Sequence, residues 1–95
     1  MKIVGKKKLS DFWRKHARAR KSLEPWVSEV ERAIWAKPQD IKDRYRLADI
    51  LPKNQVVFNL GGNNYRIVVV VVYTAETIHV THVGTHAEYA KWKLD

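Results

Sequence analysis

The chain has 95 residues, enough for one small domain with one core, and it contains no cysteine, which excludes a disulfide framework and a thiolate metal site. No apolar stretch approaches the roughly 20 residues that span a bilayer, and none follows the N-terminal lysines as in a secretory signal, so we expect a cytoplasmic protein without a membrane partner. Residues 1–23 contain nine of the eighteen Lys and Arg residues and one acid, so they carry the whole formal net charge of +8, and the rest of the chain is neutral. This asymmetry favours a polyanionic partner, above all a nucleic acid, over a basic helix face that is merely solvated.

Residues 2–5 can form a short strand, and two amphipathic helices are predicted to follow it. The first carries apolar and aromatic side chains three, four and seven positions apart, with its basic residues largely off that stripe. The second is predicted to begin after Ser22 as its N-cap and to end at Pro38. The stripes that we assign to the core are Leu9, Phe12, Trp13 and His16, the last at the rim, and Leu23, Trp26, Val27, Val30 and Ile34.

Residues 39–54 lack a clean hydrophobic period, which indicates a short helical turn followed by a loop. Strands are predicted at Gln55–Leu60, Tyr65–Tyr73 and Thr77–Val83, and their short connections make them antiparallel. Gly-Gly-Asn-Asn at 61–64 is a strong hairpin signal. The second strand is apolar on both faces and should be central.

The order of these elements predicts a compact α+β fold. We expect residues 1–95 to form a single domain, with two N-terminal helices packed on a mainly antiparallel sheet and a short C-terminal helix.

The predicted hairpin register gathers polar side chains at one end of one sheet face. Asn59 faces Arg66 across the hairpin, so the two side chains share that face. A turn at Ala75–Glu76 places Thr85 opposite Arg66 and adds a third polar group. His79 and His82 are predicted to project to opposite faces of a regular strand, and we predict no metal site and no cofactor.

A capping box predicts where the C-terminal helix begins. Thr85 is followed three residues later by Glu88, which is the spacing of that motif. His86, Tyr89 and Lys93 then lie at helical spacing on one side of the helix. The helix N-terminus presents N–H groups that favour an anion, so the predicted cluster suits a phosphodiester.

Two blocks, 57-VFNLGGNNYRIVVVV-71 and 84-GTHAEY-89, resemble the HigB family of toxin–antitoxin proteins within the RelE superfamily. The similarity covers most of residues 48–90. It implies a RelE-like fold and the activity of an endoribonuclease that cleaves mRNA on the translating ribosome. It also implies a HigA-like helix-turn-helix antitoxin as the partner, and operator DNA would be bound only through that antitoxin. Two positions depart from the family pattern, because Ala90 stands where the family has aspartate and Thr81 where it has a basic residue.

With this resemblance, Arg66, His86, Tyr89 and Asn59 become candidate catalytic residues for metal-independent RNA cleavage by attack of the 2′-hydroxyl. Arg66 is suited to stabilise the phosphorane, and His86 is the natural proton carrier. Tyr89 can position the nucleotide, stack on a base or donate a proton, and Asn59 can orient Arg66 or the phosphate. Structural alternatives are a pairing of Arg66 with Glu88, an exposed His86, a core role for Tyr89 and a turn-capping role for Asn59.

Basic residues at both ends of the chain are the candidates for RNA binding. Those near the N-terminus belong to the first helix, and those near the C-terminus could replace the cation missing at position 81. They are Lys6, Lys7, Lys8, Arg14, Lys15, Lys91 and Lys93. A non-catalytic module that binds RNA or the ribosome is the alternative function, and a protein-interaction domain is a third.

Overall fold

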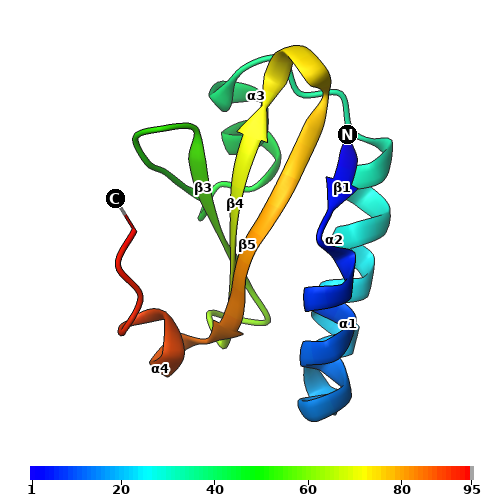
Figure 1. Ribbon diagram of the computed structural model, residues 1–95, viewed down its shortest axis with the longest axis vertical. Helices are drawn as coiled ribbons and strands as arrows, with labels where there is room; N and C mark the ends of the chain where they lie inside the picture. Colours follow the sequence, from blue (N-terminus) through cyan, green and yellow to red (C-terminus); the bar gives the residue numbers. More distant parts are fainter. Residues whose placement is uncertain (95) are drawn as a thin grey trace.

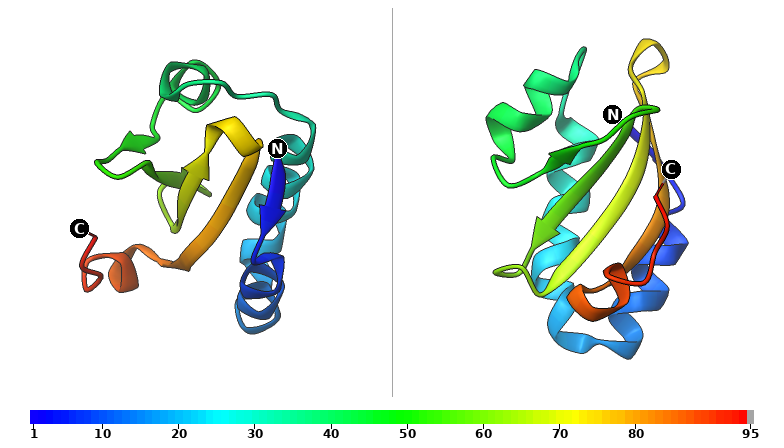
Figure 2. Two further views of the ribbon diagram at one scale, coloured as in Figure 1. Left: turned by 45° about the horizontal axis from the view of Figure 1, so that its top comes forward. Right: turned by 90° about the vertical axis from the view of Figure 1, so that its left-hand side faces the viewer.

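The computed structural model of the chain describes residues 1–94, which form a five-stranded sheet with helices along one face and a short helix at one end (Figures 1 and 2). Along the chain the elements are β1 (Lys2–Val4), α1 (Lys6–Lys15), η1 (Ala17–Ala19), α2 (Arg20–Arg32), α3 (Pro38–Arg44), β2 (Asp49–Ile50), β3 (Gln55–Leu60), β4 (Tyr65–Val72), η2 (Tyr73–Ala75), β5 (Thr77–Thr85) and α4 (His86–Tyr89). The strand order is β1-β5-β4-β3-β2, in which only the β1–β5 pair is parallel. The predicted α+β architecture, with a mainly antiparallel sheet and a short C-terminal helix, is confirmed. No helix within residues 1–94 is long and apolar enough to cross a membrane.

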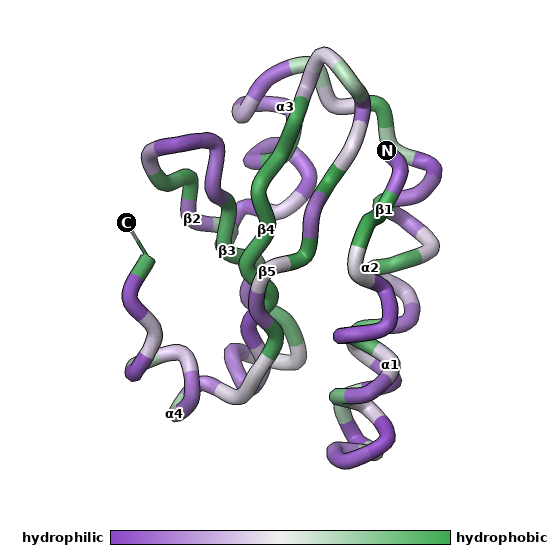
Figure 3. The backbone as a smooth tube through the Cα atoms, viewed as in Figure 1, coloured by the Kyte–Doolittle hydropathy of each residue, from purple (hydrophilic) through white to green (hydrophobic). Residues whose placement is uncertain are grey.

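Strand β4 is the centre of the sheet, as its uninterrupted apolar run predicts. Ile67, Val69 and Val71 point toward the helices and are fully buried. Val68, on the opposite face, is also fully buried. Colouring by hydropathy shows β4 as a continuously apolar strand, whereas β5 alternates and much of α1 is hydrophilic (Figure 3).

An aromatic cluster around Phe58 fixes the helices to the sheet. The Phe58 ring is 5.2 Å from that of Trp26 in α2 and 6.2 Å from that of Trp35, and Tyr45, which follows α3, meets it edge-on at 5.2 Å. Aromatic pairs of this geometry contribute about 0.5–1.5 kcal/mol beyond the area that they bury. The cluster therefore ties three segments of the N-terminal half to one strand.

The two N-terminal helices are confirmed, but the predicted bounds of the second are wrong. Ser22 is not its cap, because η1 leads directly into α2 at Arg20. The helix ends at Arg32 since Ala33 adopts extended backbone angles, and Ile34 is 80% exposed instead of buried. Pro38 does not stop α2; it is the first residue of α3, where its missing N–H is not needed.

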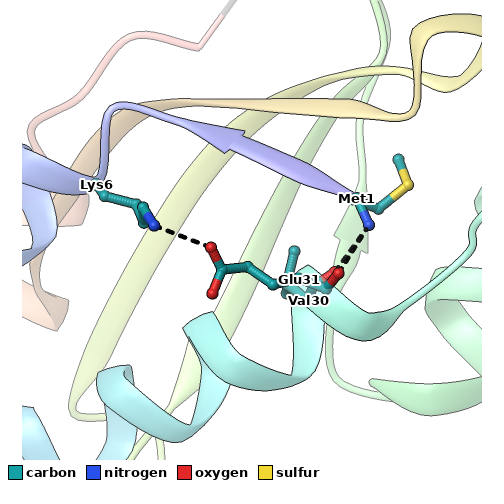
Figure 4. A network of polar contacts seen from close by, with 4 residues as sticks. All are labelled: Met1, Lys6, Val30 and Glu31. Atoms are coloured by element: carbon teal, nitrogen blue, oxygen red, sulfur yellow. Dashed lines mark hydrogen bonds and ion pairs between the residues drawn. The ribbon is translucent and has the colours of Figure 1, made fainter.

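The end of α2 is held by the first residues of the chain. The amino group of Met1 donates to the carbonyl oxygens of Val30 at 3.1 Å and Ala33 at 2.5 Å, at the C-terminal end of α2, where Val30 also accepts from the amide of Ala33. Lys6 forms an ion pair with Glu31 at 2.9 Å next to this contact (Figure 4). These contacts join β1 and the start of α1 to α2, and β1 in turn lies against β5.

The predicted β3–β4 hairpin is confirmed in register and in the bounds of β3, whereas β4 ends at Val72, one residue before the predicted Tyr73. Leu60 pairs with Tyr65 and Asn59 with Arg66. The connecting loop needs left-handed backbone at three successive positions, Gly61, Gly62 and Asn63, which explains its composition. The preceding segment contains the predicted helical turn, α3, and also β2, an edge strand that the sequence pattern did not reveal.

The predicted register of β5 is wrong by one to two positions. The tight turn lies at η2, so Val72 pairs with Thr77, and a β-bulge between Val68 and Val69 then shifts the pairing again. Gly84 therefore lies opposite Arg66, and Thr85 lies opposite Tyr65 on the other face. A bulge adds one residue to one strand and reverses the face of every residue beyond it.

The same bulge overturns the expectation for the two strand histidines. His79 pairs with Val70 and His82 with Val68, and these two valines share a face. Both histidines therefore lie on one face of the sheet. Within residues 1–94, however, no group of three or more His, Cys, Asp or Glu side chains is arranged to hold a metal ion.

Candidate active site

Arg66 lies at the start of β4, at the edge of the hairpin loop, and is the one charged residue within residues 1–94 that is classed as buried, at 9% exposure. Its Nη1 donates to the carbonyl oxygen of Asn63 at 2.9 Å and, less favourably, to that of Tyr65 at 3.5 Å. No ion pair joins Arg66 to a carboxylate in residues 1–94, and Glu88, the expected partner, instead accepts a hydrogen bond from the amide of Thr85 at 3.0 Å. The guanidinium charge therefore has only neutral acceptors, although an arginine carries five N–H donors.

His86 contacts Arg66 directly. The Nη2 of Arg66 and the Nδ1 of His86 are 2.9 Å apart, and the amide of His86 donates to the carbonyl oxygen of Asn64 at 3.0 Å. Because a guanidinium can only donate, Nδ1 accepts and the proton of the neutral imidazole lies on Nε2. His86 is exposed, so its Nε2–H group is accessible to a ligand. The contact of Nδ1 with Arg66 fixes the orientation of the ring.

Tyr89 completes a cluster of three predicted site residues. The guanidinium carbon of Arg66 lies 5.4 Å from the centre of the Tyr89 ring, a cation–π contact. The three-residue step from His86 to Tyr89 brings both side chains to Arg66, as the capping box predicts; Thr85 accepts from the amide of Glu88 at 3.2 Å. The tyrosine is half-buried against Arg66 and Trp92 and lies outside the main core.

Trp92 is a neighbour of this cluster that the sequence reasoning missed. Its ring meets the Tyr89 ring edge-on at 5.8 Å and lies against His82 at 4.9 Å. It covers Gly84, where a Cβ atom would stand 2.7 Å from the indole. The Gly84 in the quoted GTHAEY block was the available signal, because a glycine inside a strand often marks the close approach of another group.

Asn59 and Arg66 are cross-strand partners, but no hydrogen bond joins their side chains within residues 1–94. The side-chain amide of Asn59 donates instead to the carbonyl oxygen of Leu47, in the segment before β2. The predicted role of Asn59 in orienting Arg66 has no hydrogen bond to support it in the unbound protein. Its Oδ1 atom is buried without a hydrogen-bond partner within residues 1–94, so one acceptor on this face of the sheet is unused.

The predicted place of Lys93 is wrong, and the N-terminus of α4, where an anion site was predicted, has most of its amides engaged by the protein. Helix α4 is a single turn that ends at Tyr89, so Lys93 lies beyond it and does not share a helix face with His86. The amides of Thr85, His86 and Glu88 are already hydrogen-bonded to protein oxygens. Lys91 and Lys93 are exposed, with no ion pair in residues 1–94.

Thr85 was predicted to share the polar face with Arg66 and Asn59, and this is wrong, because the bulge described above places it opposite Tyr65 on the other face. Thr81, the residue that replaces a family cation, donates its hydroxyl to the carbonyl oxygen of Val68 at 3.1 Å and lies 3.0 Å from Nδ1 of His82. It thus stabilises the backbone where β5 changes register. Ala90 follows α4 and is exposed.

The basic residues of α1 divide into a paired and an unpaired set. Lys6 pairs with Glu31, Lys7 with Asp11 at 2.9 Å, and Arg14 lies 3.8 Å from the same aspartate. The hydrogen bond from Lys7 holds the pKa of Asp11 below its usual value. The two remaining lysines, Lys8 and Lys15, have no ion pair in residues 1–94 and line a groove of about 450 Å³ beside β5.

Residues 19–92, which contain the whole Arg66 cluster, match the family described as HigB_toxin, the RelE-like toxic component of a toxin–antitoxin system. The chain belongs to the HigB toxin family. Similar curated HigB proteins are the mRNA interferase toxin HigB of Escherichia coli (strain K12) and the proteins named mRNA interferase HigB of Escherichia coli O157:H7 and Shigella flexneri. Each is 26% identical to this chain, in alignments that cover 94% of it and 88% of the relative.

Membership of the HigB family confirms the resemblance read from the two sequence blocks. The β3–β4 hairpin and α4, which carry those blocks, are also the elements that supply Arg66, His86 and Tyr89. A toxic component of a toxin–antitoxin system has an antitoxin as its partner, and this coarse expectation is met by the family itself.

Proposed function

We propose that this HigB-family chain is a single-domain endoribonuclease that cleaves mRNA on the ribosome, without a cofactor, by attack of the 2′-hydroxyl on the adjacent phosphodiester. One observation carries the proposal: Arg66 is nine-tenths buried, and its guanidinium has no carboxylate partner in residues 1–94 and lies against His86 and Tyr89. Burying an uncompensated charge costs stability, so a site of this kind favours an anionic ligand. The names of the similar proteins from Escherichia coli and Shigella flexneri, which are mRNA interferases, point to mRNA.

In the proposed reaction, the scissile phosphate takes the place of His86 as the acceptor for the Nη2 of Arg66. The released His86 ring accepts the proton of the 2′-hydroxyl, whose oxygen then bonds to phosphorus. Arg66 stabilises the charge on the phosphorane, an electrostatic contribution worth about 10²–10³-fold when a donor of this kind is removed from other enzymes. The bond from phosphorus to the 5′-oxygen breaks, and Tyr89 donates a proton to that oxygen, which leaves a 2′,3′-cyclic phosphate and a 5′-hydroxyl.

The proposed partners are the translating ribosome with its mRNA, and a HigA-like helix-turn-helix antitoxin through which operator DNA is bound. The basic face of α1 supports binding to RNA, and the antitoxin follows from the family. A ribosomal site would also align the 2′-oxygen with the phosphorus, an effect that can supply much of the rate acceleration. The site of action is then the cytoplasm.

The test is to add the purified chain to programmed ribosomes in a single-turnover reaction and to identify the ends of the mRNA fragments. We expect cyclic phosphate and 5′-hydroxyl ends, formed by the parent protein and not by His86→Ala at equal concentration. Fragments with 5′-phosphate ends would refute the 2′-hydroxyl mechanism. Binding to ribosomes with intact mRNA would instead establish the second candidate function, a non-catalytic RNA-binding module.

A further inference from the structure

A groove of about 450 Å³ lies where β5 loses its neighbouring strand. Strand β1 pairs with β5 only from Thr77 to His79, and beyond that point α1 lies along this edge of β5 while α4 and the C-terminal segment lie on its other side (Figure 1). Its lining includes Lys8, Asp11 and Lys15 from α1, His82 from β5, and Glu88 and Trp92 from the C-terminal part of the chain. Three separate parts of the chain therefore form its walls.

Aromatic rings form opposite walls of the groove. On the sheet side, the His82 ring lies 4.9 Å from Trp92 at an angle of 37°, and Trp92 itself rests on Gly84. On the helix side, the exposed His16 ring stacks on Phe12 at 4.4 Å. Flat rings of this kind are the platforms on which the bases of single-stranded nucleic acids stack.

The unpaired charges at the groove include two lysines. Lys8 and Lys15 line it without an ion pair in residues 1–94. Of the two carboxylates in the lining, Asp11 is paired with Lys7, whereas Glu88 accepts from the neutral amide of Thr85 and keeps its negative charge. Two free lysines beside aromatic platforms match the combination of cationic and stacking contacts by which proteins hold single strands.

The groove is connected to Arg66 by two rings. Trp92 meets Tyr89 at 5.8 Å, and Tyr89 lies 5.4 Å from the guanidinium of Arg66. A base in the groove would thus lie within reach of a phosphate at Arg66 when both belong to neighbouring nucleotides of one strand.

We propose that this groove is a nucleotide subsite, in which a base of single-stranded RNA stacks on Trp92 while Lys8 and Lys15 contact the flanking phosphates. This inference rests on the proposed ribonuclease function and adds to it a binding role for residues that take no part in the chemistry. Trp92 is a positioning residue, since it neither touches the scissile phosphate in this arrangement nor carries a transferable proton of use to the reaction.

The test uses the full chain and a short 2′-O-methyl oligoribonucleotide, which lacks the attacking hydroxyl and stays intact. Its binding is measured by fluorescence anisotropy over a salt series. Trp92→Ala should weaken binding about 5- to 150-fold, because stacking of a base on an aromatic ring contributes that much to affinity. Trp92→Phe keeps an aromatic ring and should retain most of the binding. An oligonucleotide without bases should bind the parent and Trp92→Ala equally.

The lysines are tested with a pair of matched double variants. Lys8→Glu/Lys15→Glu should weaken binding and reduce its dependence on salt, since fewer phosphates are then neutralised. Lys2→Glu/Lys53→Glu makes the same change of net charge at exposed positions that do not line the groove, and should bind more tightly than the first pair. Because both lysine pairs are exposed, these variants are expected to fold even where Trp92→Ala does not.

Equal binding by the parent, Trp92→Phe, Trp92→Ala and the Lys8/Lys15 variant would overturn the subsite, as would a parent chain with no salt-dependent affinity for the oligonucleotide. Cleavage separates this inference from the proposed function. If the chain cleaves mRNA while the groove variants bind normally, the subsite alone is wrong. If binding depends on Trp92 but no RNA is cut, the nuclease proposal fails and the subsite stands.

Discussion

Replacement of Arg66 by alanine is the most direct test of the proposed site, and its effect on folding must be separated from its effect on catalysis. The side chain donates at 2.9 Å to Asn63 and at 2.9 Å to His86, and it packs on Tyr89. Losing these contacts from a buried cation should lower the free energy of unfolding by about 2–4 kcal/mol, since hydrogen bonds to charged groups contribute about 1.5–3 kcal/mol each. Domains of this size are stable by about 5–15 kcal/mol, so the variant should remain folded at low temperature.

The thermal midpoint should fall by about 8–30 °C, because 1 kcal/mol shifts the midpoint of a small domain by about 4–8 °C. A growth assay at a single elevated temperature would then report folding and catalysis together. We therefore expect the decisive difference in single-turnover cleavage at low temperature, where circular dichroism shows the same folded fraction for variant and parent. There the rate should fall by about 10²–10³-fold for want of the phosphorane contact.

Arg66→Lys provides the matched control, since it keeps the charge but replaces the planar fork by a single ammonium group. A phosphate-binding role predicts partial activity, above that of Arg66→Ala. If Arg66→Ala cleaves at the parent rate per folded molecule, the guanidinium is only a structural link between the hairpin loop and α4, and the reaction must be assigned to other groups.

Three further predictions concern His86 with Tyr89, Gly84 and Tyr45. His86→Ala should cut the rate of single-turnover cleavage by about 10²-fold or more, and an unchanged rate and pH profile would exclude proton transfer by His86. Tyr89→Phe should lose activity if the hydroxyl donates a proton, and it should keep activity if the ring only stacks on a base. Gly84→Ala should cost about 1–3 kcal/mol, seen as a lower thermal midpoint, because the new Cβ would stand 2.7 Å from the Trp92 ring. Burial, and then Glu29, raise the pKa of Tyr45 above its usual 10.0. The unfolded chain then loses this proton first, so the parent should lose stability as pH rises beyond that value, and Tyr45→Phe should lose less. Parallel curves of thermal midpoint against pH for the two proteins would contradict this.

The sequence predicts this fold best where local turn chemistry and side-chain alternation agree. The Gly-Gly-Asn-Asn loop allows left-handed backbone at its first three positions, and that geometry alone sets the Asn59–Arg66 pairing. The capping box likewise sets the start of α4 and the direction of His86. Both signals are local, so neither depends on contacts between distant segments.

The register of β5 was missed although the chain carries a sign of it. Ile78, Val80 and Val83 all belong to the core or pack against it. Strict alternation would require core residues two positions apart, and the step of three from Val80 to Val83 is what a one-residue bulge produces. Weighing that step against a regular strand would have moved Gly84 beside Arg66 and His82 onto the same face.

Other site features depend on segments with no readable pattern. The partner of Asn59 is a backbone carbonyl at Leu47, between α3 and β2, where the sequence shows no period. Trp92 follows the end of α4, and its place over the sheet depends on a tertiary contact with Gly84. Backbone acceptors and tertiary contacts of this kind leave no pattern in the amino-acid sequence, so they can be identified only in the folded chain.

The arrangement around Arg66 explains why a cation stands at the start of β4, the most apolar strand. A residue here must bridge the hairpin loop and α4, and arginine can do so through neutral carbonyl and imidazole acceptors while keeping its charge uncompensated. A carboxylate partner would stabilise the unbound protein better but would neutralise the anion site. An apolar residue would extend the core but would give up the contact of Arg66 with His86, leaving the hydrogen bond from the amide of His86 to Asn64 to join α4 to the hairpin loop. A bound phosphate would supply the anionic partner that Arg66 lacks in the unbound protein. The phosphate would thereby stabilise both the hairpin loop and α4.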